Sequence, residues 1–431
     1  MAKRQQQRAP ARDAALEQRI VDAPDDDAAR MVYGDWLQSR GDPLGDWVAL
    51  SGDDGYLASH LDELLGAGAL LWPGSHVTWR RGFIDELRMQ RAVDPARRAR
   101  ALFARPIARF VRRLAIAPMP KLEGVIEAVV AAAPPLLSEL LVSDGSGEHA
   151  VPAVDALADL PSLRALTLYG ASLTRALPQL RELAIAVPST VVPWLVGGGA
   201  PNVEALTLFC GTRPAPLAPV FAALPDLRAL CVIGAPREVV EAQVGDLAGQ
   251  LARIETADSL ESWVVQRVRA RGRDEVALLP FAGLHLVNAG ERLLHAERPR
   301  EALPLLDAAI TLPSRAGLRA WVGAALANLA AGLWERALAV ARAGLMRHPR
   351  EPMLLAVIVD AHRGAGRFAE ALAAVPAALD AVEARSGHYE GGAAWSIDAC
   401  ARAVTAAGDT ADARALAQRL GPRQVTAAGS P

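Results

Sequence analysis

One spacing of apolar residues recurs through the middle of the chain and constrains its fold more than any other feature. In residues 163–173, leucines stand at i, i+3, i+5 and i+10. The same L-x-x-L-x-L frame recurs in full at Ile84, Leu87 and Met89; Leu180, Leu183 and Ile185; Val203, Leu206 and Leu208; and Leu227, Leu230 and Val232; and in half at Leu114 and Ile116 and at Leu140 and Val142. Because alternate residues of a strand face the same side, each copy predicts a strand with one buried apolar edge.

The copies are evenly spaced, which indicates a repeat architecture. Measured from Leu87 to Leu230 on the middle apolar position, the steps are 27, 26, 26, 17, 23 and 24 residues. A step of 17 leaves no room for a helix, so we expect a tight turn over 173–180. Residues 77–256 resemble leucine-rich repeats, whose spacing and period these copies share. The resemblance implies a parallel sheet with helices on its outer face.

The alternation also predicts which side chains point away from the core of this sheet. They are small, uncharged and mostly apolar, and the candidate partner-binding residues are Leu141, Ser143, Thr167, Tyr169, Thr207, Phe209 and Ile233. A contiguous apolar strip on a soluble protein usually marks a binding surface. The alternative is that the chain's own C-terminal region covers the strip.

The first part of the chain is predicted to form a helical module over residues 12–76, preceded by a disordered tail over 1–11. Asp25, Asp26 and Asp27 offer an N-cap and favourable charge at the start of a helix. The motifs D-D-D-x-x-R-x-V-Y-x-D-W-L at 25–37 and R-G-D-P at 40–43 resemble the repeat-companion domain of myxobacterial and planctomycete proteins. That resemblance implies a bacterial source and a place before leucine-rich-type repeats, but no reaction.

The pattern changes again towards the end of the chain. Residues 263–279 suggest a β-hairpin that closes the solenoid, whose domain we place at 77–280. From 281 to 420 the apolar period is helical, and Ala302, Ala337, Ala371 and Ala413 follow one another at steps of 35, 34 and 42 residues. This spacing resembles tetratricopeptide repeats. The resemblance implies stacked helical hairpins, followed by a disordered tail over 421–431.

Positive charge is concentrated in residues 80–113, which hold eleven arginines against Asp85, Glu86 and Asp94. Arginine forks suit phosphate, so a nucleic-acid or polyanion site at Arg97, Arg98 and Arg100 is one interpretation. Few aromatic residues are interleaved for stacking on bases. The other interpretations are a solvated helix face and a face that pairs with the acidic N-terminal module.

Composition narrows the compartment and the class of protein. The formal charge of -2 over 431 residues argues against binding nucleic acid or a membrane through the whole surface. Three scattered cysteines and an N-terminus without an apolar core favour a cytoplasmic protein without disulfides. The longest uncharged run, 183–201, contains prolines and glycines and does not suit a membrane span.

The sequence shows no pattern that carries chemistry. The eight histidines lack metal-ligand spacing, and no nucleophile elbow, phosphate loop or dinucleotide fingerprint is present. We therefore expect neither an enzyme nor a metal or cofactor. The predicted fold is an α/β leucine-rich-repeat-like solenoid with an N-terminal helical module and a C-terminal all-α tetratricopeptide-like solenoid. The predicted function is a scaffold that binds an unidentified protein partner, and the alternative is a polyanion binder.

Overall fold

The computed structural model describes residues 12–50, 54–65, 76–89, 93–117, 119, 121–143, 154–186, 191–210, 217–244, 251–271, 282–312, 317–384 and 390–420. The two predicted tails, 1–11 and 421–431, lie outside these residues. The chain divides into two compact units between Trp263 and Val264. The first unit contains a sheet, and the described part of the second is helical.

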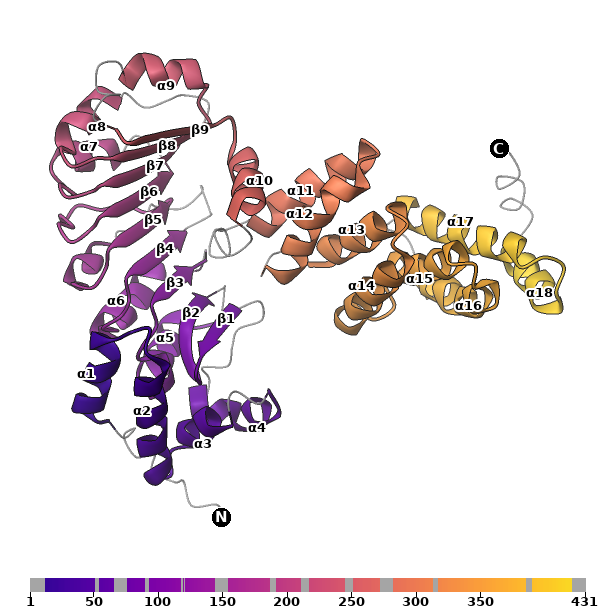
Figure 1. Cartoon of the computed structure of the whole chain (residues 1–431), viewed down its shortest axis with the longest axis horizontal. Coiled ribbons are helices and arrows are strands. Elements are labelled where there is room, and N and C mark those ends of the chain that lie inside the picture. The colour runs from indigo at the N-terminus through magenta and orange to yellow at the C-terminus, as the bar shows by residue number, and fades with distance from the viewer. Residues whose placement is uncertain are drawn as a thin grey trace. The chain divides into compact units, whose positions relative to one another are not determined.

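Within the described residues, nine strands form one sheet in sequence order (Figure 1). β1 and β2 are antiparallel, and every later neighbour is parallel. The strands are β1 (His76–Arg80), β2 (Phe83–Met89), β3 (Arg113–Ile116), β4 (Glu139–Ser143), β5 (Ala165–Tyr169), β6 (Glu182–Ala186), β7 (Ala205–Phe209), β8 (Ala229–Ile233) and β9 (Arg253–Ala257).

The seven strands expected from the leucine frame are present as β2 to β8, and their predicted register is confirmed. The middle apolar positions pair across the sheet as one continuous row: Leu87, Leu114, Leu140, Leu166, Leu183, Leu206 and Leu230. Ile254 of β9 continues the row. All but Ile254 are almost completely buried, so the row forms the spine of the core.

Helices and short connections cover one face of this sheet (Figure 1). They are α5 (Pro95–Phe103), η1 (Pro106–Ala108), α6 (Leu122–Ala132), η2 (Asp155–Asp159), α7 (Val191–Val196), α8 (Leu217–Ala223) and α9 (Arg237–Val244). Residues 170–181, between β5 and β6, contain no helix, which confirms the turn expected from the short step. Alternation of helix and parallel strand thus follows the length of each step.

The N-terminal module consists of α1 (Ala14–Asp22), α2 (Asp27–Ser39), α3 (Pro43–Ala49) and α4 (Asp54–Leu65). Asp26 caps α2, as expected, by accepting a hydrogen bond from the Ala28 amide. Tyr33 stacks on Phe83 of β2, and the Trp47 indole donates to the Gly82 carbonyl. One apolar core therefore runs from this module into the sheet.

Arg30, the arginine of the N-terminal motif, has a structural role. It is 1% exposed and donates from Nη1 to the Pro24 carbonyl at 2.6 Å. Burial lowers its pKa, as do the nearby charges of Arg80 and Arg112, although Asp85 opposes them. The motif thus fixes the turn before α2 rather than presenting a charge to solvent.

The hairpin predicted at 263–279 is wrong where the structure describes it. Residues Leu260–Arg271 form a helix, α10, and 272–279 lie outside the described residues. Val264 and Val268 are four residues apart and both buried, which is helical spacing. The Ser259 hydroxyl accepts a hydrogen bond from the Ser262 amide at 3.1 Å, as an N-cap does.

The described residues from 282 to 420 form helical hairpins in which alternate helices also pack on one another. Ala302, Ala337, Ala371 and Ala413 are buried on the second helix of successive hairpins, so the predicted spacing is confirmed. The helices are α11 (Ala282–His295), α12 (Pro299–Thr311), α13 (Gly317–Ala330), α14 (Trp334–Arg347), α15 (Pro352–Gly364), α16 (Phe368–Ala384), α17 (Glu390–Ala406) and α18 (Ala411–Leu420).

Candidate binding surfaces

The residues predicted to form an apolar strip do lie together on the face of the sheet opposite its helices. Thr167 lies beside Leu141 in the register, and Thr207, two strands further along, pairs with Cys231. In the adjacent row Ser143 pairs with Tyr169, and Phe209 pairs with Ile233. The alternation rule therefore placed these side chains on the correct face.

The strip is not open, however, and the expectation of an exposed surface is wrong. Leu141, Ser143, Phe209 and Ile233 are 6%, 1%, 9% and 2% exposed, and the other three residues are half-buried. Alternation determines which way a side chain points but not what packs over it. A partner could reach the buried residues only after a rearrangement.

One end of the strip is covered by the first turn of α10. Phe209, Ile233 and Ala257 form an apolar cluster with Leu260 and Trp263. The Phe209 ring meets the Trp263 ring edge to face, with centroids 6.2 Å apart. These two α10 residues were missed because the segment was interpreted as a strand, although Trp263 falls at a helical distance from Leu260. The cluster holds the start of α10 on the sheet.

Tyr169 lies beside this cluster and presents an unusual polar group. Its ring lies 4.9 Å from that of Phe209. Its hydroxyl is buried without a hydrogen-bond partner among the described residues. Burial raises the pKa of Tyr169, so the side chain stays a neutral phenol and is suited to packing rather than to acid–base chemistry.

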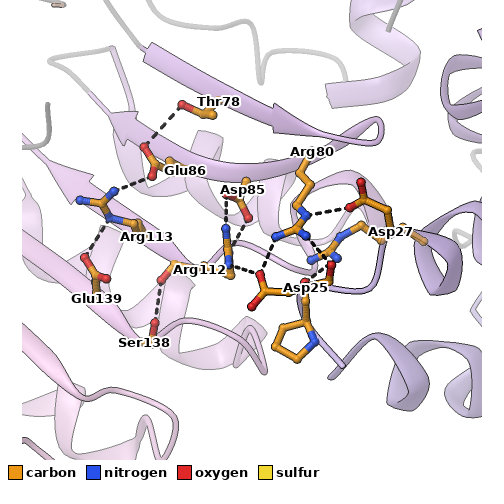
Figure 2. Close-up of polar contacts among 12 residues, drawn as sticks. Asp25, Asp27, Thr78, Arg80, Asp85, Glu86, Arg112, Arg113, Ser138 and Glu139 are labelled. Atoms are coloured by element: carbon orange, nitrogen blue, oxygen red, sulfur yellow. Dashed lines mark hydrogen bonds and ion pairs between the residues drawn. The ribbon is translucent and has the colours of Figure 1, made fainter. Parts of the chain in front are cut away.

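The arginine-rich segment contributes mainly to ion pairs that tie the N-terminal module to the sheet (Figure 2). Arg80 of β1 donates to Asp27 at 2.9 Å and to Asp25 at 2.7 Å. Arg112 makes two bonds with Asp85, at 2.6 and 2.7 Å, and a third with Asp25 at 3.0 Å. Hydrogen bonds from Arg80 and the charge of Arg112 lower the pKa of Asp25.

Two further arginines continue this network. Arg81 donates to Asp27 at 2.9 Å. Arg113 bridges neighbouring strands by donating to Glu86 at 2.6 Å and to Glu139 at 2.8 Å. Pairing with the acidic N-terminal module, one of the expected interpretations, is therefore confirmed for Arg80, Arg81 and Arg112.

Arg97, Arg98 and Arg100, the residues proposed for polyanion binding, behave differently. They lie on α5, where Arg97 and Arg100 are exposed and Arg98 is half-buried. None of them forms an ion pair within the part of the chain that the structure describes. Their charge is therefore available to a ligand.

A groove in the C-terminal unit was not signalled by the sequence. It has a volume of about 600 Å³ and runs between α16 and α18. Phe368, Leu372 and Pro376 form the α16 side, and Asp412 and Leu416 belong to the α18 side. Phe368 is 45% exposed. Eight of its ten lining residues are apolar and Asp412 is its charged one, so the groove is suited to an apolar side chain.

The buried carboxylates of both units are held by arginines. Asp360 of α15 is 4% exposed and accepts from Arg363 at 2.9 Å and from Arg402 at 2.5 Å. Asp85 is bound by Arg112, as described above. Among the described residues, no group of three or more histidines, cysteines, aspartates and glutamates has an arrangement that could hold a metal ion. None of the described helices combines the length and apolar character needed to cross a bilayer.

Neither the family models nor the curated protein sequences yield a match to this chain. Among solved structures, PilW, described as a widely conserved type IV pilus biogenesis factor, is similar over 39% of this chain and 79% of its own. The aligned residues are 16% identical and the TM-score is 0.30. That similarity supports no inference about function. The leucine-rich-repeat, tetratricopeptide and repeat-companion resemblances remain predictions from the sequence.

Proposed function

We propose that this protein is a non-enzymatic scaffold that binds a partner protein through its C-terminal helical unit. The observation that carries the proposal is the apolar groove between α16 and α18, with the partly exposed Phe368 on its wall. Solenoids of stacked repeats commonly use such extended surfaces for binding. The carboxylates held by arginines support a structural rather than a catalytic use of the buried charges.

The groove also indicates the chemistry of its occupant. An apolar side chain of the partner would fill the space beside Phe368 and Leu372. Asp412 would then attract a basic residue that flanks this anchor. The expected partner segment therefore carries a large apolar residue next to a lysine or arginine.

A displayed-peptide library tests this proposal, because selection from a library does not require the partner protein to be identified first. The full chain should enrich peptides with the apolar-plus-basic pattern. Phe368→Asp should weaken the binding of an enriched peptide by about tenfold or more, because a central apolar anchor is usually worth over 1 kcal/mol.

Met346→Asp is the matched control, because Met346 of α14 is 85% exposed and lies outside the groove. It should leave peptide affinity unchanged within about twofold. A library that yields no such pattern, or equal losses in both variants, would contradict the proposal.

The apolar strip on the sheet is a second surface for a partner. It would require α10 to leave Phe209 and Ile233, so we propose it only as a site that opens. We also propose a cytoplasmic location, which is supported by Cys210, Cys231 and Cys400 being free thiols.

The alternative function is nucleic-acid or polyanion binding by residues 80–113. It is favoured by Arg97, Arg98 and Arg100, which have no internal ion pair among the described residues. It is weakened by Arg80, Arg112 and their neighbours, whose charges are already engaged (Figure 2). A nucleic-acid complex would weaken steeply as salt rises.

A further inference from the structure

A second hollow lies in the first unit, on the helical side of the sheet. Its volume is about 330 Å³, and it is lined by residues of α5, η1, α6 and the beginning of the described chain. Four of its lining residues are arginines: Arg12, Arg100, Arg105 and Arg109. A pocket of this volume is near the lower end of the range for small-molecule sites.

The charges around this pocket are not balanced. Glu17 is the one carboxylate in its lining, and it is 6% exposed. Arg12 binds it through Nε at 2.9 Å and Nη2 at 2.6 Å, and Arg109 approaches it at 3.3 Å. Within the described residues, Arg100 and Arg105 form no ion pair. Four guanidinium groups therefore face one carboxylate.

The rest of the pocket is apolar and small. Phe103, Pro106 and three alanines of α6 contribute to its lining. An apolar wall strengthens the attraction between an arginine and an anion, because less water screens the pair. Phe103 is only 6% exposed, so the pocket lacks an open aromatic face on which a nucleobase could stack.

We propose that this pocket binds a small phosphate-bearing molecule. A phosphate group carries a charge of about -1.5 to -2 at neutral pH, which offsets most of the uncompensated positive charge. Its oxygens accept the paired bonds that arginine forks donate. Arg100 and Arg105 would bind the phosphate directly, because they have no internal ion-pair partner among the described residues, while Glu17 holds Arg12 and Arg109 in place. This site is independent of the proposed scaffold function.

Pyrophosphate is a suitable probe, and isothermal titration of the full chain at low ionic strength measures its binding. The wild-type protein should show saturable binding with a Kd on the order of 1 mM or tighter. The double variant Arg100→Gln and Arg105→Gln should bind at least about tenfold more weakly, because each arginine contributes a charge-assisted hydrogen bond.

The control is the double variant Arg97→Gln and Arg98→Gln. It removes the same charge from the same segment, but neither residue lines the pocket. Its affinity for pyrophosphate should stay within about threefold of the wild-type value. Thermal melting without ligand should show that both variants are folded, since the substituted side chains make no internal ion pair among the described residues.

Two results would overturn the proposal. The first is the absence of saturable binding by the wild-type protein for both pyrophosphate and inorganic phosphate. The second is an equal loss in the two double variants, which would indicate attraction by the whole basic surface. A single-stranded oligonucleotide that binds more tightly than pyrophosphate, and is lost equally in both variants, would favour the polyanion alternative instead.

Discussion

Gly82 shows how closely the N-terminal module fits the sheet at the residue scale. Its φ of +78° belongs to the left-handed region, and its carbonyl accepts the Trp47 indole hydrogen bond. A Cβ at this position would lie 2.7 Å from Val48 Cγ2 and 2.9 Å from Trp47 Cδ1. We predict that Gly82→Ala destabilises the protein by about 3–4 kcal/mol, from backbone strain and overpacking together.

Gly41→Ala separates these two contributions. Gly41 has a similar φ of +68°, but a Cβ there would meet nothing within 4 Å. It should therefore cost about 1–2 kcal/mol, from backbone strain alone. Urea unfolding followed by tryptophan fluorescence measures both variants. Equal losses would show that α3 does not press against the turn between β1 and β2.

Glu17 is a residue whose contribution should depend on pH. Burial alone would raise its pKa, but the hydrogen bond and charge of Arg12, together with Arg109, outweigh burial and lower the pKa. A depressed native pKa contributes stability above the unfolded value of about 4.3, and this stability is lost as the pH falls through the native pKa.

We therefore predict that Glu17→Gln costs about 1–3 kcal/mol at neutral pH, because Arg12 and Arg109 lose a buried carboxylate while Arg12 stays half exposed. The gap between variant and wild type should close in acid as Glu17 itself becomes protonated. Unfolding free energies at neutral and acidic pH test this prediction. A gap that is constant with pH would show that the loss comes from packing.

At the scale of elements, the leucine frame predicted β2 to β8 because the rows are buried on one side and repeat in register. β9 was missed, although it keeps the 24-residue step from Leu230 to Ile254, since Thr256 stands where the frame has an apolar residue. α10 was mistaken for a strand because its valines and tryptophan are also typical of strands. Local pattern could not reveal the contact that decides between the two.

The candidate surfaces were less predictable than the strands. Trp334 and Phe368 both begin the second helix of a hairpin, one 34-residue step apart. Trp334 lies against Gly364, whereas Phe368 is 45% exposed. The same aromatic position is thus packed in one hairpin and open in the next. The spacing after Phe368 changes to 42 residues, but that irregularity does not identify which side chain becomes exposed.

The contact between α10 and the sheet can be tested by a double-mutant cycle. Phe209→Ala should cost about 3 kcal/mol or more, because the ring is 9% exposed and packs in an apolar cluster. Trp263→Ala should cost about 2–3 kcal/mol, since it is less buried. The two losses should differ from additivity by about 0.5–1.5 kcal/mol, as expected for an edge-to-face aromatic pair.

The cycle is measured by chemical unfolding, with Val239→Ala as a control. Val239 of α9 is 37% exposed and lies outside the cluster, so its loss should be small and additive with that of Phe209→Ala. Full additivity between Phe209→Ala and Trp263→Ala would indicate that α10 does not rest on the sheet. The apolar strip would then be open, as the sequence suggested.

At the scale of the whole molecule, the division between Trp263 and Val264 assigns most of α10 to the C-terminal unit. We therefore predict that a fragment of residues 258–431 folds on its own and has a strongly helical circular dichroism spectrum. A fragment of residues 282–431 should also be helical but less stable, by about 2–4 kcal/mol, because it lacks the buried Val264 and Val268. Thermal and urea unfolding of the two fragments measure the difference. Equal stabilities would place α10 entirely with the sheet, and a spectrum rich in strand, or a transition without cooperativity, would show that the second unit depends on the first for its fold.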